Sequence, residues 1–70
     1  MHKRPLKNKV KTLRFMANEM TQSELGEQVG VTRQTIAAIE AGKYSPSLEC
    51  AFRIAEVLAQ PLEKVFHWEK

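Results

Sequence analysis

The stretch TQSELGEQVGVTRQTIAAIEAG, residues 21–42, constrains the fold more than any other, because helix start and stop signals follow one another closely within it. Thr21 and Glu24 have the spacing of a capping box, in which a hydroxyl and a carboxylate satisfy backbone N–H groups that the helix leaves unpaired. Gly30 can adopt the positive φ that ends a helix and turns the chain. We therefore predict a short helix over about residues 22–29.

A second short helix is predicted directly after this turn. Thr32 is placed to cap it, and Gly42 supplies a stop signal. Ile36 and Ile39 have the three-residue spacing that turns one face of a helix toward the core. Two short helices held at a fixed angle by a tight turn form a helix-turn-helix, which we place over residues 22–41.

The face of this second helix that lies opposite Ile36 carries side chains suited to a partner. A step of about 100° per residue places Gln34 and Ala38 on that face, with Arg33 on its flank. In the major groove of DNA, Arg can reach guanine O6 and N7, Gln can pair with adenine, and an alanine methyl can contact a thymine methyl. The alternative is an ordinary exposed helix end, although a solvated helix usually carries Lys and Glu there.

Length and composition favour a small protein without disulfides. Seventy residues are enough for a single domain, which we place over residues 1–70. A domain of this size buries little apolar surface, which favours dimerisation. Cys50 is the single cysteine. The sequence has neither an apolar run long enough to span a bilayer nor a signal-peptide core, and it predicts a cytoplasmic protein, associated with the nucleoid when bound to DNA.

Positive charge is concentrated near the N-terminus. The first 14 residues hold six of the eleven basic residues and no acid, whereas the rest of the chain carries five basic and eight acidic residues. Such a distribution favours a polyanion as partner at one side of the molecule. A solvated tail has the same composition, so charge alone leaves both interpretations open. We treat residues 1–6 as a basic N-terminal arm.

Three further helices are expected outside the central motif. The first should begin near Lys7 or Asn8 and end near Ala17 or Asn18. Another should run from about Leu48 to Ala59, and a short last one from Leu62 to Phe66. The expected apolar stripe of the longest helix, which leaves Ile54 and Val57 outside its centre, consists of Leu48, Ala51, Phe52, Ala55, Leu58 and Ala59.

With these elements in place, the chain resembles the Xre group of bacterial, archaeal and phage helix-turn-helix regulators, which includes the Cro and phage-repressor DNA-binding domains. The resemblance rests on MTQSELGEQVGVTRQTIAAIEAGKYSPSLE, followed by an apolar helix and then PLEKVF. It implies an all-α, five-helix, lambda-repressor-like DNA-binding domain, with a small two-stranded sheet formed by the chain termini in some members. It also implies a transcriptional repressor that binds double-stranded DNA and is not an enzyme.

The resemblance assigns roles to individual positions. Arg14 and Glu40 match a structural ion pair between the first helix and the recognition helix. The positions that match base contacts are Arg33, Gln34, Ala38 and Thr32. The positions that match phosphate contacts are Gln22, Thr21, Thr35, Lys43 and Tyr44.

Two departures from the family pattern lie close to the motif. Gly26 stands where the family usually has alanine, at the crossing of the two helices, and glycine inside a helix costs roughly 1 kcal/mol. The segment between Leu13 and Thr21 is one residue longer than the common spacing.

A two-fold symmetric homodimer is expected through a segment at residues 62–70. The apolar side chains near this end exceed what a small core requires, and compact members of the family often dimerise here. The expected interface residues are Leu62, Val65, Phe66 and Trp68. By the same analogy, Lys3 to Leu6 would pair with Phe66 to Glu69. The operator would then be palindromic, with half-sites about one helical turn apart.

Other functions receive less support from the residues. His2, Cys50 and His67 lack the spacing of a zinc site, and no catalytic Ser/His/Asp or Cys/His set is suggested. No cofactor, small-molecule effector or membrane partner is expected. The main alternative is an antitoxin that neutralises a protein partner and also binds its own operator. Nearly all residues are needed for the five helices, which leaves little chain for a toxin.

Overall fold

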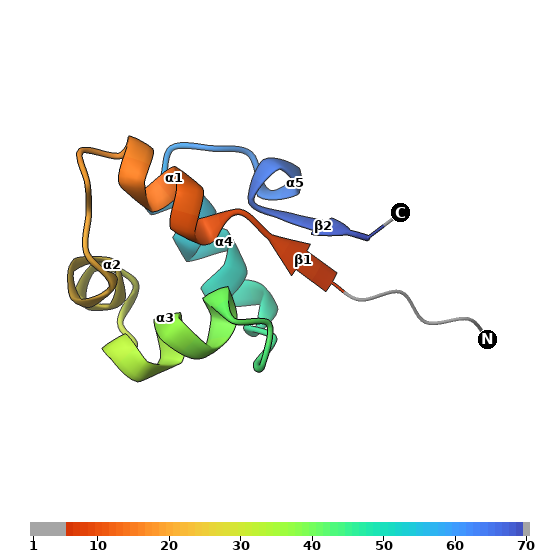
Figure 1. Ribbon diagram of the computed structural model, residues 1–70, viewed down its shortest axis with the longest axis horizontal. Coiled ribbons are helices and arrows are strands. Elements are labelled where there is room, and N and C mark those ends of the chain that lie inside the picture. Colours follow the sequence, from red (N-terminus) through yellow and green to blue (C-terminus); the bar gives the residue numbers. More distant parts are fainter. Residues whose placement is uncertain (1–5, 70) are drawn as a thin grey trace.

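The computed structural model describes residues 6–69, and within this range the chain forms five helices and one two-stranded antiparallel sheet (Figure 1). The elements in chain order are β1 (Leu6–Asn8), α1 (Val10–Met16), α2 (Gln22–Val29), α3 (Arg33–Glu40), α4 (Leu48–Val57), α5 (Leu62–Val65) and β2 (Phe66–Trp68). The expected all-α, five-helix fold with a small sheet is confirmed.

Local capping sets the limits of α2 where the sequence places them. The Thr21 hydroxyl accepts a hydrogen bond from the Glu24 backbone N–H at 3.0 Å, and the Glu24 carboxylate accepts one from the Thr21 N–H at 2.8 Å. Gly30 ends the helix with a φ of 93°. Both signals act within a few residues, which is why the sequence alone predicts them well.

The start of the chain differs from the expectation, because residues 6–8 form a strand rather than the first turn of a helix. The strand pairs Leu6 with Trp68, Lys7 with His67 and Asn8 with Phe66. The Lys9 N–H also donates to the Val65 carbonyl at 2.9 Å, so α1 begins only at Val10.

The expected pairing of Lys3–Leu6 with Phe66–Glu69 can be compared with the structure only at Leu6, which lies opposite Trp68. Lys3, Arg4 and Pro5 lie outside the described residues, as does most of the expected basic arm over residues 1–6. Residues 7 and 8 also pair with β2, and helical periodicity near the N-terminus does not reveal this long-range backbone pairing.

One apolar core joins all five helices. The side chains with the least exposure come from every helix, and they are Val10, Leu25, Ile36, Ile39, Ile54 and Val65. The two strands lie together at one end of the molecule, and the connection from α1 to α2 lies at the other (Figure 1). The helix-turn-helix thus rests on α4, and α1 and α5 link it to the sheet.

The predicted apolar stripe of α4 is wrong at three residues, which are exposed, and correct at three others, which are buried. The exposed residues are Leu48, Phe52 and Ala59, and the buried ones are Ala51, Ala55 and Leu58. Ile54 is fully buried, whereas Leu48 is 70% and Phe52 is 54% exposed. The buried line of this helix runs through the predicted small residues Ala51 and Ala55, which allow close helix packing, and continues to Leu58, the C-cap residue. Leu48 and Phe52 consequently form an apolar outer face. The helix also ends at Val57, before the expected Ala59.

Candidate nucleic-acid interface

The N-terminal end of α3 presents two polar side chains to solvent. Thr32 caps the helix, because its hydroxyl oxygen accepts a hydrogen bond from the Thr35 N–H at 3.2 Å. Arg33 and Gln34 follow in the first turn and are exposed, while Ile36 on the same helix is fully buried. The cap and the buried face therefore fix which way the first turn points.

Arg33 and Gln34 are free to bind a partner. Over residues 6–69, neither side chain is held by a hydrogen bond or an ion pair within the protein. Ala38, one turn further along α3, is half-buried and leaves room for close approach. A guanidinium fork, an amide and a methyl group are the three kinds of group that read base edges in the major groove.

A buried ion pair ties α1 to the end of α3. The Arg14 Nε donates to Glu40 Oε2 at 2.8 Å, and its Nη2 donates to Oε1 at 3.1 Å. The side chains of Arg14 and Glu40 are only 9% and 7% exposed. Arg14 Nη1 also donates to the Met20 carbonyl at 2.8 Å. Arg14 thus joins the first helix to the turn before α2 and to the end of α3.

The extra residue between α1 and α2 does not displace this pair. Asn18 and Glu19 both adopt left-handed backbone conformations, with φ angles of 61° and 55°. The Met20 N–H then returns to the Arg14 carbonyl at 3.0 Å. Two consecutive left-handed residues thus absorb the additional length, and the Met20 carbonyl remains within reach of the Arg14 guanidinium.

Gln22 opens α2 beside the same network. Its Nε2 donates to Glu40 Oε1 at 3.0 Å, and the residue is half-buried. The hydroxyls of Thr21 and Thr35 are also engaged, the first in the capping box and the second 3.0 Å from the Thr32 hydroxyl. These three residues, which the family resemblance assigns to phosphate contacts, therefore have hydrogen-bond partners within the protein. Their side chains would already be held in position before a phosphate bound.

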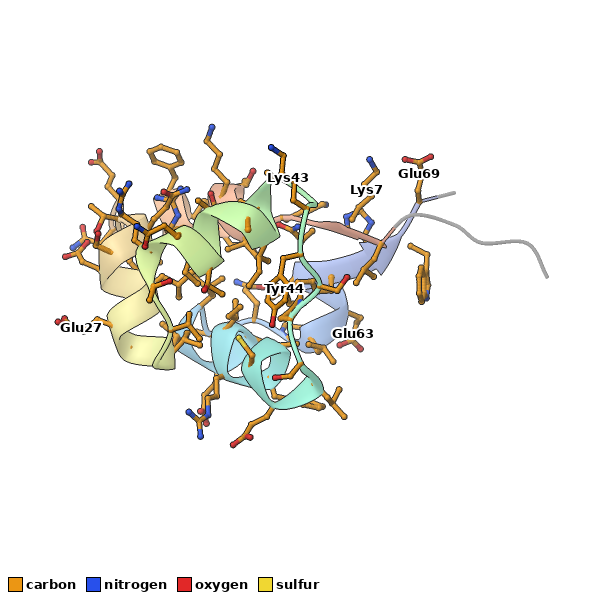
Figure 2. All side chains as sticks on the ribbon, turned by 90° about the horizontal axis from the view of Figure 1, so that it is seen from below. Lys7, Glu27, Lys43, Tyr44, Glu63 and Glu69 are labelled. Atoms are coloured by element: carbon orange, nitrogen blue, oxygen red, sulfur yellow. The ribbon has the colours of Figure 1, made fainter. Side chains whose placement is uncertain are left out.

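Lys43 and Tyr44 lie in the loop after α3, and both are exposed. The Lys43 N–H donates to the Ala38 carbonyl at 2.9 Å, which fixes the loop to the last turn of the helix. In Figure 2, which views the molecule from below, Lys43 and Lys7 extend to the same side, and Glu27 on α2 lies at the far end. The two lysines thus come from different elements and face the same way.

Asn8 is a site residue that the sequence analysis missed. Its Nδ2 donates to the Ile39 carbonyl at 2.9 Å, and its Oδ1 accepts from the Val10 N–H at 3.1 Å. An asparagine two residues before a helix is a recognisable local signal, because its side chain often bonds the backbone two residues on. The contact with Ile39 spans 31 positions, and no local pattern predicts it.

The expected dimerisation segment needs one correction. Val65 is 0% exposed and belongs to the core of the monomer, so its side chain is not available to a second copy. Leu62 and Phe66 are half-buried, and Trp68 is 56% exposed. Val65 is the last residue of α5 and its side chain points into the core. The spacing of apolar residues along the sequence does not predict which of these side chains points inward.

An open apolar groove adjoins Trp68. Its volume is about 670 Å³, and α4, α5 and the sheet all contribute to it. Apart from Glu63 its lining is apolar, and it consists of Leu6, Pro46, Leu48, Ala51, Leu62, Phe66 and Trp68. Leu48 was not expected here, because it lies far from residues 62–68 in the sequence, whereas Leu6 was expected to pair with this segment.

The remaining chemistry of the described residues is limited. Among residues 6–69, no group of three or more His, Cys, Asp and Glu side chains is arranged to hold a metal ion. Burial raises the pKa of the Cys50 thiol, and the nearby Arg53 opposes this increase in part. The thiol is therefore protonated at neutral pH. No helix in the same part of the chain is long and apolar enough to cross a membrane.

The sequence of this chain is similar to those of known helix-turn-helix proteins. The sequence profile of a helix-turn-helix family matches residues 10–65. An uncharacterized HTH-type transcriptional regulator of Methanocaldococcus jannaschii is 48% identical over 64 residues, which cover 91% of this chain and 96% of the relative. An uncharacterized HTH-type transcriptional regulator of Bacillus subtilis is 51% identical over 65 residues, which cover 93% of this chain and 97% of the relative.

A solved structure has a similar fold. The crystal structure of a candidate DNA-binding protein from Bacteroides fragilis superimposes with a TM-score of 0.77 and 26% sequence identity. The match covers 89% of this chain and 98% of that chain. Both proteins are therefore of nearly the same extent and have the same arrangement of elements.

Proposed function

The chain belongs to this helix-turn-helix family, and on that premise we propose that it is a sequence-specific regulator of transcription that binds double-stranded DNA. The proposal includes a repressor role and an inverted-repeat operator bound by a homodimer. The observation that carries it is the free pair Arg33 and Gln34 on the capped first turn of α3. A recognition helix uses its N-terminal residues to contact base edges.

Base reading and phosphate contact are assigned to different residues. Arg33, Gln34, Ala38 and Thr32 lie at the N-terminal and outer part of α3, where they would enter the major groove. Phosphate contacts are proposed for the flanks of this helix, through Gln22, Thr21, Thr35, Lys43 and Tyr44. Because Gln22 is held by Glu40, the ion-pair network supports its proposed contact as well as the angle of α3.

Dimerisation would supply the second half of the binding site. One recognition helix contacts few base pairs, and two copies related by a two-fold axis read two half-sites. The apolar groove beside Trp68 is the proposed contact, with Leu62, Phe66 and Trp68 joined by Leu6 and Leu48. Val65 supports this surface from the core.

Selection of bound duplexes from a random DNA pool tests the proposal directly. The wild-type protein should return a two-fold symmetric sequence with half-sites about one helical turn apart. Arg33→Ala and Gln34→Ala should each lower affinity for that sequence by about 1 to 3 kcal/mol and change affinity for random DNA much less.

Arg53→Ala provides a charge-matched control, because Arg53 lies on α4 and pairs with Glu49. It should weaken binding to selected and random duplexes by similar small amounts. Equal losses on both kinds of duplex for Arg33→Ala would instead assign Arg33 to phosphate contact. A protein that selects no duplex but retains a stoichiometric protein partner would favour the antitoxin-type role.

A further inference from the structure

Asn8 joins three elements that the proposed function requires to be held together. It lies in β1 opposite Phe66 of β2, so its backbone belongs to the terminal sheet. Its side chain donates to the carbonyl of Ile39 near the end of α3, at 2.9 Å. The same amide accepts the N–H of Val10, the first residue of α1, at 3.1 Å. One residue is therefore part of the sheet through its backbone and contacts the first helix and α3 through its side chain.

The contact with α3 is made at a carbonyl in the last turn of that helix. The last four carbonyls of a helix have no partner in the next turn, and Ile39 provides one of them. Gly42 N–H bonds the Ile39 oxygen at 3.0 Å, and Asn8 Nδ2 is its second donor. The amide of Asn8 thus binds the end of α3 without disturbing the helical hydrogen bonds.

The surroundings leave little freedom for this contact to slide. Asn8 is half-buried and lines a space of about 20 Å³ between the sheet and the loop after α3, together with Phe66 and Tyr44. A space of this size holds about one water molecule at most. The Asn8–Ile39 hydrogen bond therefore lies in surroundings with little free space.

We infer that Asn8 is a positioning residue that sets the placement of the recognition helix relative to the terminal sheet, and hence the half-site spacing that a dimer prefers. The inference rests on the proposed function, in which the sheet region of each copy meets its partner and α3 meets DNA. In such a dimer, the distance between the two recognition helices depends on how Asn8 in β1 holds Ile39 of α3 in each copy. Loosening this connection would let the helices fit several spacings.

The test compares operator spacing preferences of Asn8 variants. Asn8→Asp keeps the acceptor for the Val10 N–H but replaces the donor to Ile39 with a carboxylate oxygen. Asn8→Leu is of similar shape, is uncharged and loses both contacts. Each protein is titrated with duplexes that carry two copies of the selected half-site at the preferred spacing or one base pair closer or further, and with a duplex that carries one copy.

The readout is the ratio of affinities between the preferred and altered spacings. For both Asn8 variants this ratio should fall by about 3- to 10-fold, the range that corresponds to one side-chain hydrogen bond. Affinity for the single half-site should fall only slightly for both variants, because one half-site sets no spacing between two recognition helices. The added charge of Asn8→Asp affects every duplex alike and therefore cancels in the ratio. Ser47→Ala is the matched control, since it loses one capping contact, the hydrogen bond from the Cys50 N–H, and Ser47 is assigned to neither DNA nor the sheet. Its melting temperature should fall while its spacing ratio stays as in the wild type.

The possible failures are distinct. If both Asn8 variants melt earlier but keep the wild-type spacing ratio, Asn8 only stabilises the fold and the inference is overturned. If the wild-type protein binds a single half-site as tightly as a pair, the proposed dimeric function fails, and the inference fails with it.

Discussion

At the residue scale, Gly26 allows α2 and α3 to cross at their observed separation. A Cβ atom built on Gly26 would lie 2.7 Å from the Val31 carbonyl oxygen and 3.3 Å from the Thr32 carbonyl carbon. Both neighbours are backbone atoms of the turn, which cannot move without shifting α3. An alanine at this position therefore requires the backbone of the turn to shift.

We predict that Gly26→Ala destabilises the protein despite the higher helix propensity of alanine. The propensity gain is about 1 kcal/mol, and overpacking of a tight site costs about 1 to 3 kcal/mol, so the net change should be unfavourable. Thermal unfolding followed by circular dichroism measures it. Gln28→Ala, at an exposed position of α2, should melt at or slightly above the wild-type temperature. A Gly26→Ala protein that matches this control would show that the turn yields easily.

A second residue-scale prediction concerns two ion pairs of equal length. The Arg14–Glu40 and Arg53–Glu49 pairs both have a closest N–O distance of 2.8 Å, but only the first is buried. Glu40→Ala strands the Arg14 guanidinium and the Gln22 amide, and such a loss costs about 3 to 5 kcal/mol. Glu49→Ala removes a surface pair, which contributes at most about 1 kcal/mol. Urea unfolding of both variants compares them, and similar midpoints would contradict a structural role for the buried pair.

At the element scale, the sequence predicts the helices where the determinants are local. The limits of α2 follow from Thr21, Glu24 and Gly30, whose hydrogen bonds and φ angle span a few residues. The core face of α3 follows from Ile36 and Ile39 for the same reason. The free side chains of α3 are predicted together with that face, since one periodicity determines both.

The elements that the sequence misplaces depend on distant partners. β1 exists because residues 6–8 pair with β2 at the other end of the chain. On α4, Leu48 and Phe52 satisfy helical periodicity, yet the close approach of Ala51 and Ala55 to the core decides which side is buried. The apolar groove depends on both of these tertiary arrangements, and the Asn8 contact depends on the first. Spacing along the sequence therefore predicts neither the groove nor the contact.

The ends of α3 and α4 have the same backbone conformation, but different residues occupy the equivalent left-handed position. At the end of α3, Gly42 has a φ of 74° and the Lys43 N–H bonds the Ala38 carbonyl at 2.9 Å. At the end of α4, Ala59 has a φ of 57° and the Gln60 N–H bonds the Ala55 carbonyl at 3.0 Å. Both are Schellman motifs, which favour glycine at the left-handed position.

We predict opposite effects of exchanging these two residues. Ala59→Gly relieves a left-handed conformation that costs a residue with a Cβ about 1 to 2 kcal/mol, and it should raise the melting temperature. Gly42→Ala introduces the same cost and should lower it. In a domain of this size, 1 kcal/mol corresponds to about 4 to 8 °C. Calorimetry of both variants measures the shifts, and a destabilised Ala59→Gly protein would contradict the backbone explanation.

At the scale of the whole molecule, the exposed apolar residues are unevenly distributed. Leu48 and Trp68 line the groove beside the sheet, while Met16 lies at the end of α1, on the opposite side from the sheet (Figure 1). Leu48 and Met16 are 70% and 74% exposed, so they expose similar fractions of their surfaces. The groove differs in that several apolar side chains adjoin one another, which is typical of an interaction surface.

The last prediction uses this contrast to test the proposed dimer. Trp68→Ala and Leu48→Ser should each weaken self-association, because a second copy would bury both side chains, and loss of a central tryptophan commonly costs about 2 kcal/mol or more. That free energy corresponds to an increase of about 30-fold in the dimer dissociation constant. Met16→Ser should leave association unchanged.

Val65→Glu is unsuitable, because Val65 is fully buried and the variant would unfold the monomer. Sedimentation equilibrium at micromolar concentrations measures all three variants beside the wild type, and the proposed interface is rejected if the wild type is monomeric at tens of micromolar or if Met16→Ser weakens association as much as Leu48→Ser does.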